Sequence, residues 1–454
     1  MALLYKHPCA IFALALTCAV VFAHGSWRYG FTDVVAWGSV AAVLSVALFP
    51  AQRKNQPHVH AQRDVLRGLC KDPLLYLGFA LLLLMATQAL NHGREMEYDV
   101  PGARWVFGAP PLRRLPGSLN PGAAWRVFFT FLPAVAVAAC LCHGVALAGR
   151  VAYLGLLAVL SGGVAVWEAG VCAWFGGETD GWRVFSNADH GGIWFLLCLV
   201  VSIVLWGHAC VSGRPGGVQF VYLSCALLNV AGMAAYRAPV ALLLAGFAGV
   251  PLALATVAAA WKTLGPARRA VALAVFAVVL PLAVCMAGLG LVRNAKPEGE
   301  PVPWAQMIFK EGRELRMEVV WKMAKDHPVY GVGGGNYPYF SRVYWPAPNI
   351  REYSTMGVAV DNDYAQTLAE LGGAGCVLLL AMLVLAGVSR RPWKGLPPAC
   401  KCLHVLYIAG MGAVFAAAWV ESPFRSPPVL VSMAAALACA PGFLTHPQTG
   451  EDTA

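Results

Sequence analysis

Acidic and basic side chains inside long apolar stretches are the residues of this sequence most able to carry chemistry. Four of them stand out, Glu168, Arg237, Glu370 and Glu421. An ionisable side chain at membrane depth is costly, so it is a candidate for function by default. Arg237 also fits an interfacial position from which its guanidinium reaches water. Glu168 fits an interfacial position equally, and both interpretations stay open for each residue.

A polar stripe opens the apolar segment that begins near residue 362. Asp363, Thr367 and Glu370 are spaced i, i+4 and i+7, which places them on one face of a helix. Because a polar stripe is unfavourable against lipid, it should face the interior of a bundle or a water-filled cavity. Asp361 and Asn362, just before it, are residue types that cap helix N-termini. Capping explains these two residues as well as catalysis does.

The string GVGGGN at residues 331–336 has the glycine content of phosphate-binding loops. A nucleotide-binding loop follows a strand and opens a helix. This one follows Asp326-His327-Pro328 on the predicted outer face of a membrane, so the sequence argues against a nucleotide site. Two interpretations remain, a tight turn beside a surface helix and a backbone that approaches a ligand.

The elements that must position these residues are membrane-spanning helices. Of the 454 residues, 59% are apolar and 12% are charged, against about 45–50% and about 25% in soluble domains. The mean hydropathy is +0.62. These figures exclude a water-soluble globule, a coiled coil, a collagen and a disordered chain. Most of the 14 cysteines lie in apolar runs, where they behave as small hydrophobic residues rather than metal ligands.

The lengths of the apolar runs predict an all-α fold, a polytopic transmembrane helix bundle. A helix needs about 20 mostly apolar residues to cross a bilayer, which gives about 10–12 spans here. The expected spans lie near 9–25, 31–50, 73–91, 124–146, 151–169, 191–212, 218–235, 238–261, 270–292, 362–388, 402–421 and 428–445. We therefore expect an N-terminal bundle of about nine spans over 1–292, an outer loop domain over 293–361 and C-terminal transmembrane helices over 362–454.

The basic residues indicate how the bundle is oriented. Lys and Arg collect in alternate short loops, including 51–72, 262–269 and 390–401. Such loops are cytoplasmic in membrane proteins, so both termini should be cytoplasmic. Topology thus accounts for much of the net charge of +10, and nucleic acid is not an expected partner. In the outer loop, apolar residues at helical spacing predict an amphipathic helix over 304–325, near the outer leaflet.

Three blocks of the sequence follow one another on the predicted outer side. Tyr236-Arg237-Ala238 precedes an apolar helix, GRELRMEVVWKMAKDHPVYGVGGGNY spans 312–337, and DNDYAQTLAELGGAG spans 361–375. They are similar, in order, to a Ser-Arg-Gly segment, an Arg-containing helix with a His-Pro-x-x-Gly-x-Gly-x-Gly-Asn turn, and a His-Asn-x-Tyr helix. With an Asn motif near 185–190, this region of about 185–380 resembles the O-antigen ligase and polymerase family of membrane glycan-transfer proteins.

The resemblance implies a glycosyltransferase of the bacterial inner membrane. Such a protein moves a glycan from a polyprenyl-diphosphate carrier to an acceptor hydroxyl at the periplasmic face, by lipid A-core ligation or by polysaccharide polymerisation. The implied partners are the lipid-linked donor, a glycan or lipid-core acceptor and membrane lipid, with no metal or other cofactor. The alternative is a transporter or flippase of lipid-linked glycan that uses the intramembrane charges.

The resemblance also assigns the diphosphate-binding residues. Arg237 matches the family arginine before the apolar helix, and Arg313 matches the one that opens the loop helix. Arg316, one turn later, could fill the role of Arg313. Arginine suits this task because its guanidinium stays protonated and binds phosphate in a bidentate manner. Glu370, Gly333 and Asn336 are expected to support the site.

The family pattern changes at the position of the expected base. Asp361, followed by Asn362, stands where O-antigen ligases have a histidine that is taken as catalytic. An unperturbed Asp has a pKa of about 3.9 against about 6.5 for His, so an aspartate is the weaker base unless burial changes this. Asp361 could instead orient the acceptor, with His190 or His327 as the base. An Asp-Asn start also resembles polysaccharide polymerases, and the choice between ligase and polymerase stays open.

Overall fold

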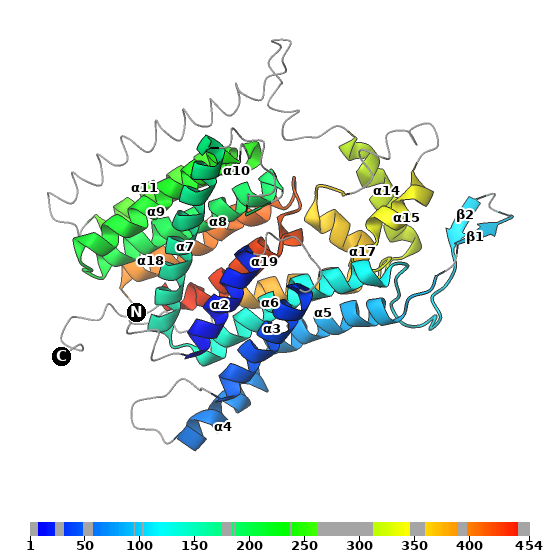
Figure 1. The fold of residues 1–454 in the computed structure, drawn as a ribbon, viewed down its shortest axis with the longest axis horizontal. Helices are drawn as coiled ribbons and strands as arrows, with labels where there is room; N and C mark the ends of the chain where they lie inside the picture. The colour runs from blue at the N-terminus through cyan, green and yellow to red at the C-terminus, as the bar shows by residue number, and fades with distance from the viewer. Residues whose placement is uncertain are drawn as a thin grey trace, which may run out of the picture.

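The computed structural model describes residues 8–22, 31–48, 58–94, 96–101, 104–174, 184–185, 187–236, 238–261, 312–345, 359–387 and 397–443. These residues form helices almost throughout, which confirms the predicted all-α bundle (Figure 1). Arg237 and the expected span at 270–292 lie outside the described residues.

The helices follow the apolar runs of the sequence. In the first part of the chain they are α2 (Pro8–Phe22), α3 (Phe31–Leu48), α4 (His58–Leu69), α5 (Pro73–Leu90), α6 (Pro121–Gly144) and α7 (Leu147–Trp174). Next come α8 (Ala188–Val211), α9 (Gly216–Ala235), α10 (Pro239–Leu244), the π-turn η1 (Ala245–Gly249) and α11 (Val250–Ala260). The last are α17 (Asp363–Gly387), α18 (Pro398–Ala417), η3 (Pro423–Arg425), α19 (Pro427–Cys439) and η4 (Ala440–Phe443).

Side-chain caps define where several of these helices begin. Asp72 accepts a hydrogen bond from the amide of Leu74 at 2.9 Å at the start of α5. Asn120 accepts one from the amide of Ala123 at 3.1 Å at the start of α6. In both helices a proline follows the cap. The first residue of a helix donates no hydrogen bond within the helix, so the missing N–H of proline costs nothing there, and its fixed φ matches the first turn.

Among the described residues, eight helices are long and apolar enough to cross a membrane: Pro73–Leu90, Pro121–Gly144, Leu147–Gly170, Ala188–Val211, Gly216–Ala235, Pro239–Ala260, Asp363–Ala386 and Pro398–Ala417. Three shorter apolar helices accompany them, Pro8–Phe22, Thr32–Val46 and Pro427–Phe443. Each lies close to a span that the sequence predicts. The chain is therefore a multi-pass membrane protein.

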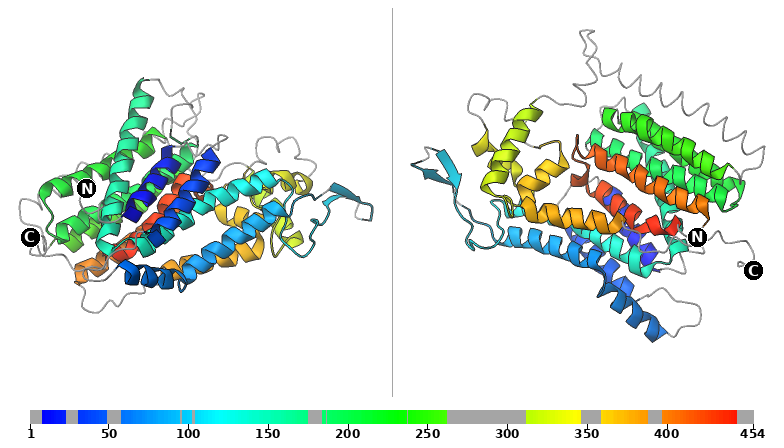
Figure 2. Two further views of the ribbon diagram at one scale, coloured as in Figure 1. Left: turned by 60° about the horizontal axis from the view of Figure 1, so that its bottom comes forward. Right: turned by 180° about the vertical axis from the view of Figure 1, so that it is seen from behind.

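The bundle has two groups of helices joined by α19. In one group α8, almost wholly buried, packs against α7, α9, α10, α11 and α18. In the other, α6 packs against α2, α3 and α5, and α17 packs against α5. Helix α19 contacts both α6 and α8, and Figures 1 and 2 show it running between the two groups. This arrangement leaves α17 beside α5 and α6, where the candidate site is found.

A small extramembrane assembly lies at one end of α5, α6 and α17 (Figure 1). It contains α14 (Arg313–Asp326), α15 (Tyr337–Tyr344) and the antiparallel hairpin of β1 (Met96–Asp99) and β2 (Arg104–Phe107). The predicted amphipathic helix is thus observed from Arg313 onward, and residues 304–311 lie outside the described residues. Val319 and Met323 are fully buried in a cluster with Phe340 of α15. The apolar stripe of α14 therefore packs on protein, against α15 and α17.

Candidate functional site

Two arginines of α14 meet the residue that precedes α17. The Nη2 atom of Arg316 lies 3.1 Å from Oδ2 of Asp361. Arg313 donates from Nη2 to the backbone carbonyl of Asp361 at 3.3 Å and also to the carbonyl of Trp419. Since α14 turns once between positions 313 and 316, both guanidinium groups reach the same end of α17. The structure thus brings together Arg313, Arg316 and Asp361, three of the predicted site residues.

Asp361 has an unusual backbone conformation. Its φ is +53°, and it is the only non-glycine residue with positive φ in the described part of the chain. Left-handed backbone is uncommon outside glycine, and Asn, Asp and His are the side chains that tolerate it best. Such conformations persist where the surrounding structure demands them, often at ligand sites. Asn362, the next residue, caps α17 by accepting a hydrogen bond from the amide of Ala365 at 3.0 Å.

Arg316 is buried without full hydrogen bonding. Its exposed fraction is 5%, and within the described residues neither Nε nor Nη2 has a hydrogen-bond partner. The Asp361 carboxylate lies at an ion-pair distance from Nη2 but is not aligned for a hydrogen bond. For Arg313, burial lowers the pKa of the guanidinium from its ordinary value, while Glu421 and Asp361 oppose that shift. An arginine still remains charged under such a shift, so the pair offers two positive charges to an anion.

A second ion cluster begins two residues further along. Arg425, in η3, lies with Nη1 2.5 Å from Oε2 of Glu370 and with Nε 3.6 Å from Oδ1 of Asp363. The amide of Phe424 donates to Asp363 Oδ2 at 2.7 Å, and Gln366 donates to Glu370 Oε1 at 2.8 Å. Burial alone would lower the pKa of Arg425, but the two carboxylates raise it above its ordinary value. Both oxygens of Glu370, predicted as a supporting residue, thus have donors in this buried network, whereas Oε1 of Gln366 has no hydrogen-bond partner among the described residues.

Helix α17 is interrupted at Gly372, where φ is 64° and ψ is −167°. The glycine-rich loop fills the interruption: Val332 and Gly333 donate to the carbonyls of Ala369 and Glu370, both at 2.9 Å. On the other side, Gly373 donates to the carbonyl of Pro328 at 2.8 Å. The carbonyls of Ala369 and Glu370 and the amide of Gly373, on either side of the break, therefore find partners in the loop.

The glycines of this loop are needed for close backbone packing. A Cβ on Gly331 would lie 2.5 Å from the carbonyl carbon of Glu370, and one on Gly333 would lie 2.6 Å from the Cβ of Ser118. Both residues also have positive φ. Asn336 is fully buried and ties the loop to α6, accepting from the amide of Asn120 at 2.7 Å. The geometry therefore favours the tight-turn interpretation, in which Gly333 and Asn336 act through the shape of the loop.

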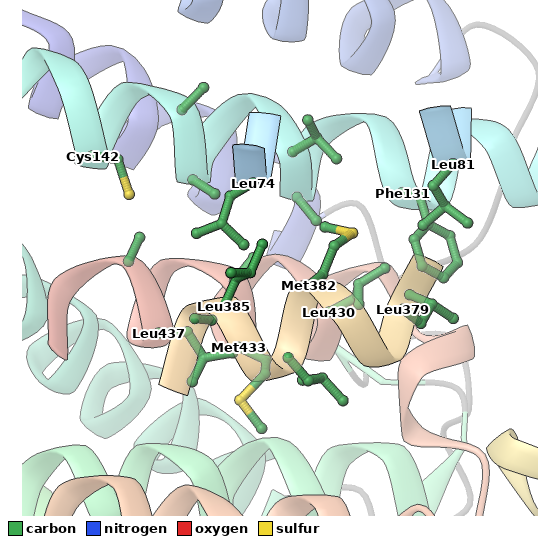
Figure 3. A pocket seen from close by; sticks show the side chains of 18 of the residues that line it. Leu74, Leu81, Phe131, Cys142, Leu379, Met382, Leu385, Leu430, Met433 and Leu437 are labelled. Carbon is green, nitrogen blue, oxygen red and sulfur yellow. The ribbon is translucent and has the colours of Figure 1, made fainter. Parts of the chain in front are cut away.

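An apolar cavity of about 960 Å³ lies between α5, α6, α17 and α19. Figure 3 shows Leu81, Phe131 and Met382, from three different helices, directed into the same space. One end of the cavity is lined by Asp363, Thr367, Glu370 and Arg425, and the other by Asp72, His143 and Arg150. Gln88 donates to the carbonyl of Glu370, and Asp72 lies 16 residues before Gln88 along α5. At 1.5 Å per residue, the two charged ends are about 24 Å apart.

The predicted polar stripe of α17 faces this cavity. Asp363 and Glu370 are buried, and both line the cavity together with Thr367. Asp361 lies just two residues before Asp363, so the arginines of α14 are close to the charged end of an elongated apolar space.

The two histidines occupy different places. His327 ends α14, its ring packs on Phe340 at 5.8 Å, and burial with the nearby Arg94 charge lowers its pKa to about 4. It lies eleven residues beyond Arg316 on the same helix, which separates them by roughly 16 Å along the axis. His190 lies in the first turn of α8, which packs mainly against α9 and α18 rather than α14.

Arg237 itself lies outside the described residues, but its neighbour Tyr236 is anchored. The Tyr236 hydroxyl donates to Oε1 of Glu168 at 2.6 Å, and the same oxygen accepts from the amide of Val184 at 2.6 Å. Glu168 is 1% exposed. For Glu168 the sequence left an interfacial and a functional position open. In the structure its carboxylate connects Tyr236 to Val184 and so holds two segments of the chain together.

Sequence reasoning missed Arg425 and Gln88. Arg425 follows an apolar span in the string ESPFRSP, where a loop cation is unremarkable. Gln88 is fully buried near the end of α5, donates to the carbonyl of Tyr330 at 2.8 Å and accepts from the amide of Gly334 at 3.0 Å. The one feature of the sequence that could have found Gln88 is a polar residue inside an apolar run. Such a residue is expected to be buried, but its position does not identify a partner more than 200 residues away.

Comparison with known proteins adds one match. Residues 225–380, roughly a third of the chain, match the model of the family described as O-antigen ligase. The match includes Arg313, Arg316, Asp361 and the interrupted helix, but not Arg425. No curated protein matches the chain. The family match agrees with the motifs of the sequence and with a bundle of membrane-spanning helices. Over residues 225–380 the chain is thus similar to the O-antigen ligase family, and its apolar helices make it a multi-pass membrane protein.

Proposed function

We propose that this protein transfers a glycan from a polyprenyl-diphosphate carrier to an acceptor hydroxyl, at the periplasmic face of the inner membrane. The observation that carries the proposal is the meeting of Arg313, Arg316 and Asp361 near the charged end of the apolar cavity. A lipid diphosphate requires this combination, because its head needs fixed cations and its chain needs an apolar enclosure.

The donor is expected to bind with its diphosphate at Arg313 and Arg316, joined by Arg237. Arg316 supports this placement because it is buried with unused donors, and phosphate oxygens can accept from both sides of a guanidinium. The polyprenyl chain would then follow the cavity, whose walls are leucine, methionine and phenylalanine side chains over about 24 Å.

Transfer needs a base and a stabilised leaving group. In the proposed step the acceptor oxygen attacks the anomeric carbon, and the carbon–oxygen bond to the phosphate breaks. The electron pair leaves with the diphosphate, whose negative charge the arginines stabilise, and the hydroxyl proton passes to Asp361. Asn362 supports Asp361 from its capping position. The arginines supply the positive charge, so we expect transfer to persist after treatment with EDTA.

The direction of α5 supports a periplasmic site. The basic loop at 51–72 precedes its N-terminal end, whereas Gln88, near its C-terminal end, contacts Glu370 beside the site. If the basic loop is cytoplasmic, as its charge favours, the site faces the periplasm. Both termini are then cytoplasmic.

The experiment is transfer by the purified protein in nanodiscs, with a polyprenyl-diphosphate glycan as donor. Lipid A-core and a second lipid-linked repeat unit are offered as separate acceptors, which distinguishes ligation from polymerisation. Arg237→Ala, Arg313→Ala, Arg316→Ala and Asp361→Ala should each lower transfer at least about 100-fold. Lys322→Ala is the matched control, because Lys322 is a cation of α14 that pairs with Glu318 on the exposed face. Wild-type transfer in all four site variants would refute the proposal.

A transporter or flippase remains the second candidate, and the interruption of α17 is the observation that favours it. Discontinuous helices form substrate sites in transporters. Here, however, the glycine-rich loop occupies the interruption and satisfies its backbone groups, which favours a rigid site. Movement of labelled lipid-linked glycan across proteoliposomes, without transfer to an acceptor, would support the flippase instead.

A further inference from the structure

We propose that the turn at residues 111–116 docks the acceptor through the phosphate of its lipid anchor, with Arg113 and Arg114 as the binding residues. The inference rests on the proposed function, in which both candidate acceptors, lipid A-core and a second lipid-linked repeat unit, carry phosphate at the membrane surface. It adds a binding site for the acceptor, separate from the arginines expected to bind the donor.

Arg113 and Arg114 are adjacent cations on the surface of the protein, and both side chains are exposed. Among the described residues, no ion pair holds either guanidinium. A guanidinium binds phosphate oxygens in a bidentate manner. Basic residues of membrane proteins gather in cytoplasmic loops, so two adjacent arginines at the end of the bundle that carries the site require another reason. Binding of an anion supplies one.

The turn is held in one conformation by Asn91, which follows α5 and is 5% exposed. Its side-chain oxygen accepts from the amide of Leu112 at 3.0 Å, and its Nδ2 donates to the carbonyl of Leu112 at 3.1 Å. The same nitrogen donates to the carbonyls of Leu115 and Pro116, both at 3.2 Å. The amide of Leu115 donates to the carbonyl of Leu112 at 3.0 Å, which closes the backbone around the two arginines. A turn ordered in advance loses little entropy when a ligand binds.

The leucines beside the arginines place the turn at the level of the lipid headgroups. Leu112 is 58% exposed and Leu115 is 46% exposed. The turn lies between the end of α5 at Leu90 and the start of α6 at Pro121, both helices that can cross the membrane. Exposed leucines at such a position are expected to enter the lipid, while the neighbouring guanidinium groups reach the phosphates.

The turn adjoins the proposed transfer site through Gln88 of α5. Ser118, two residues after the turn, donates to the carbonyl of Gln88 at 2.8 Å, and the side chain of Gln88 donates to the carbonyl of Glu370 at 3.1 Å. Ser118 also packs on the glycine-rich loop, where a Cβ on Gly333 would lie 2.6 Å from its own Cβ. A lipid held at the turn is thus placed beside the site and outside the donor cavity, and its glycan can extend towards α17.

An anionic phospholipid of the surrounding bilayer is the competing occupant. Segments that recognise bulk anionic lipid by charge gather about four to eight basic residues, whereas this turn has two, Arg113 and Arg114. Attraction to bulk lipid requires neither an ordered turn nor a position beside the glycine-rich loop. Order and position together favour one defined lipid, the acceptor.

The test measures the KM for the acceptor in Arg113→Ala, in Arg114→Ala and in the double variant. The full-length proteins are placed in nanodiscs of phosphatidylcholine, so that no anionic phospholipid competes. The acceptor is lipid A-core or a lipid-linked repeat unit with a phosphonate linkage, which cannot act as a donor, whichever the wild-type protein uses. We expect the KM to rise about 5-fold in each single variant and about 30-fold in the double variant, with little change in kcat.

Two controls isolate the phosphate. With the same acceptor glycan freed from its lipid, the double variant should transfer as the wild-type protein does, which also shows that the variant is folded. The double variant Arg63→Ala/Arg67→Ala is the matched charge control. It removes two exposed arginines of α4, the helix that precedes α5 at its other end, and should leave the KM unchanged.

The possible failures separate the two proposals. If the double variant at the turn keeps the wild-type KM for the lipid-linked acceptor, as it would if the turn bound only bulk phospholipid, the docking site is wrong. It is equally wrong if transfer to the soluble glycan falls by the same factor, or if the α4 control raises the KM as much. If instead the wild-type protein transfers glycan to none of the acceptors offered, the proposed function itself fails.

Discussion

Two arginine–carboxylate clusters lie on either side of Asn362, and they differ in how completely their groups are satisfied. Around Arg425, both carboxylates accept hydrogen bonds from backbone or amide donors in addition to the arginine. Around Arg316, two guanidinium nitrogens have no hydrogen bond in the described residues, and the aspartate has left-handed backbone. The carboxylates around Arg425 are thus fully bonded, whereas the guanidinium of Arg316 is not.

The difference indicates which cluster stabilises the fold and which binds a ligand. A buried charge that lacks partners destabilises the protein. A buried charge whose partners are in place avoids that penalty, as Arg425 does between α17 and η3. An unsaturated arginine is retained when its missing partner arrives with a ligand. The four predictions below test this distinction, from the largest expected effect to the smallest.

Arg425→Ala should destabilise the protein more than any other single change considered. It leaves Glu370 and Asp363 buried without their cation, which costs about 3–5 kcal/mol of unfolding free energy. Thermal unfolding in detergent measures the loss, and Arg425→Lys should recover part of it. If the variant instead unfolds like wild type and loses only transfer, the Arg425 cluster binds the ligand rather than stabilising the fold.

Arg316→Ala should have the opposite effect, a large loss of transfer and little loss of stability. Removing a donor that stabilises the leaving group typically lowers transfer by about 100- to 1,000-fold, whereas removing a poorly bonded buried charge leaves unfolding within about 1 kcal/mol of wild type. Initial transfer rates and thermal unfolding of the same sample give both numbers. Lys322→Ala, on the exposed face of α14, should change neither. A large loss of stability in Arg316→Ala would mean that the two clusters are alike.

Gly372→Ala should test whether the interruption of α17 is required. The new Cβ would lie 2.4 Å from the carbonyl oxygen of Val329, at a φ of 64°, so we expect a loss of about 2 kcal/mol or more. Gly412→Ala is the control, because Gly412 lies inside α18 and a Cβ there meets nothing within 4 Å. That change should stabilise by about 0.5–1 kcal/mol. Equal effects at the two glycines would show that α17 can straighten.

His327 should affect stability in acid rather than transfer. Its pKa is lowered to about 4 in the folded protein, against about 6.5 when unfolded. The unfolded state therefore binds more protons between those values, so stability falls as the pH drops from about 6.5 to about 4 and is unaffected above that window. His327→Asn should reduce this acid loss and leave transfer at pH 7 unchanged. A large loss of transfer would instead make His327 the base.

Several features could be predicted from the sequence because they depend on local pattern. The apolar runs predicted the spans, and the i, i+4, i+7 spacing of Asp363, Thr367 and Glu370 predicted the polar face of α17. The helical spacing of Val319 and Met323 predicted α14. The meeting of Arg313 and Arg316 with Asp361 was expected through the family motifs alone, since nothing in their spacing relates residue 316 to residue 361. Arg425 was not predicted.

What the sequence by itself determined is the class of the protein, its helices and the residues able to carry charge within them. These follow from hydrophobicity and periodicity, which act over one or two helical turns. Only the tertiary structure decided that the guanidinium of Arg425 has its hydrogen-bond partners and that of Arg316 does not. It also decided that the glycine-rich loop after α14 packs against the break in α17 at Gly372. Those outcomes depend on contacts between residues that lie 37 to 282 positions apart in the sequence. A buried charge is stabilised or destabilised by the groups around it, and the chain brings those groups together only when it folds.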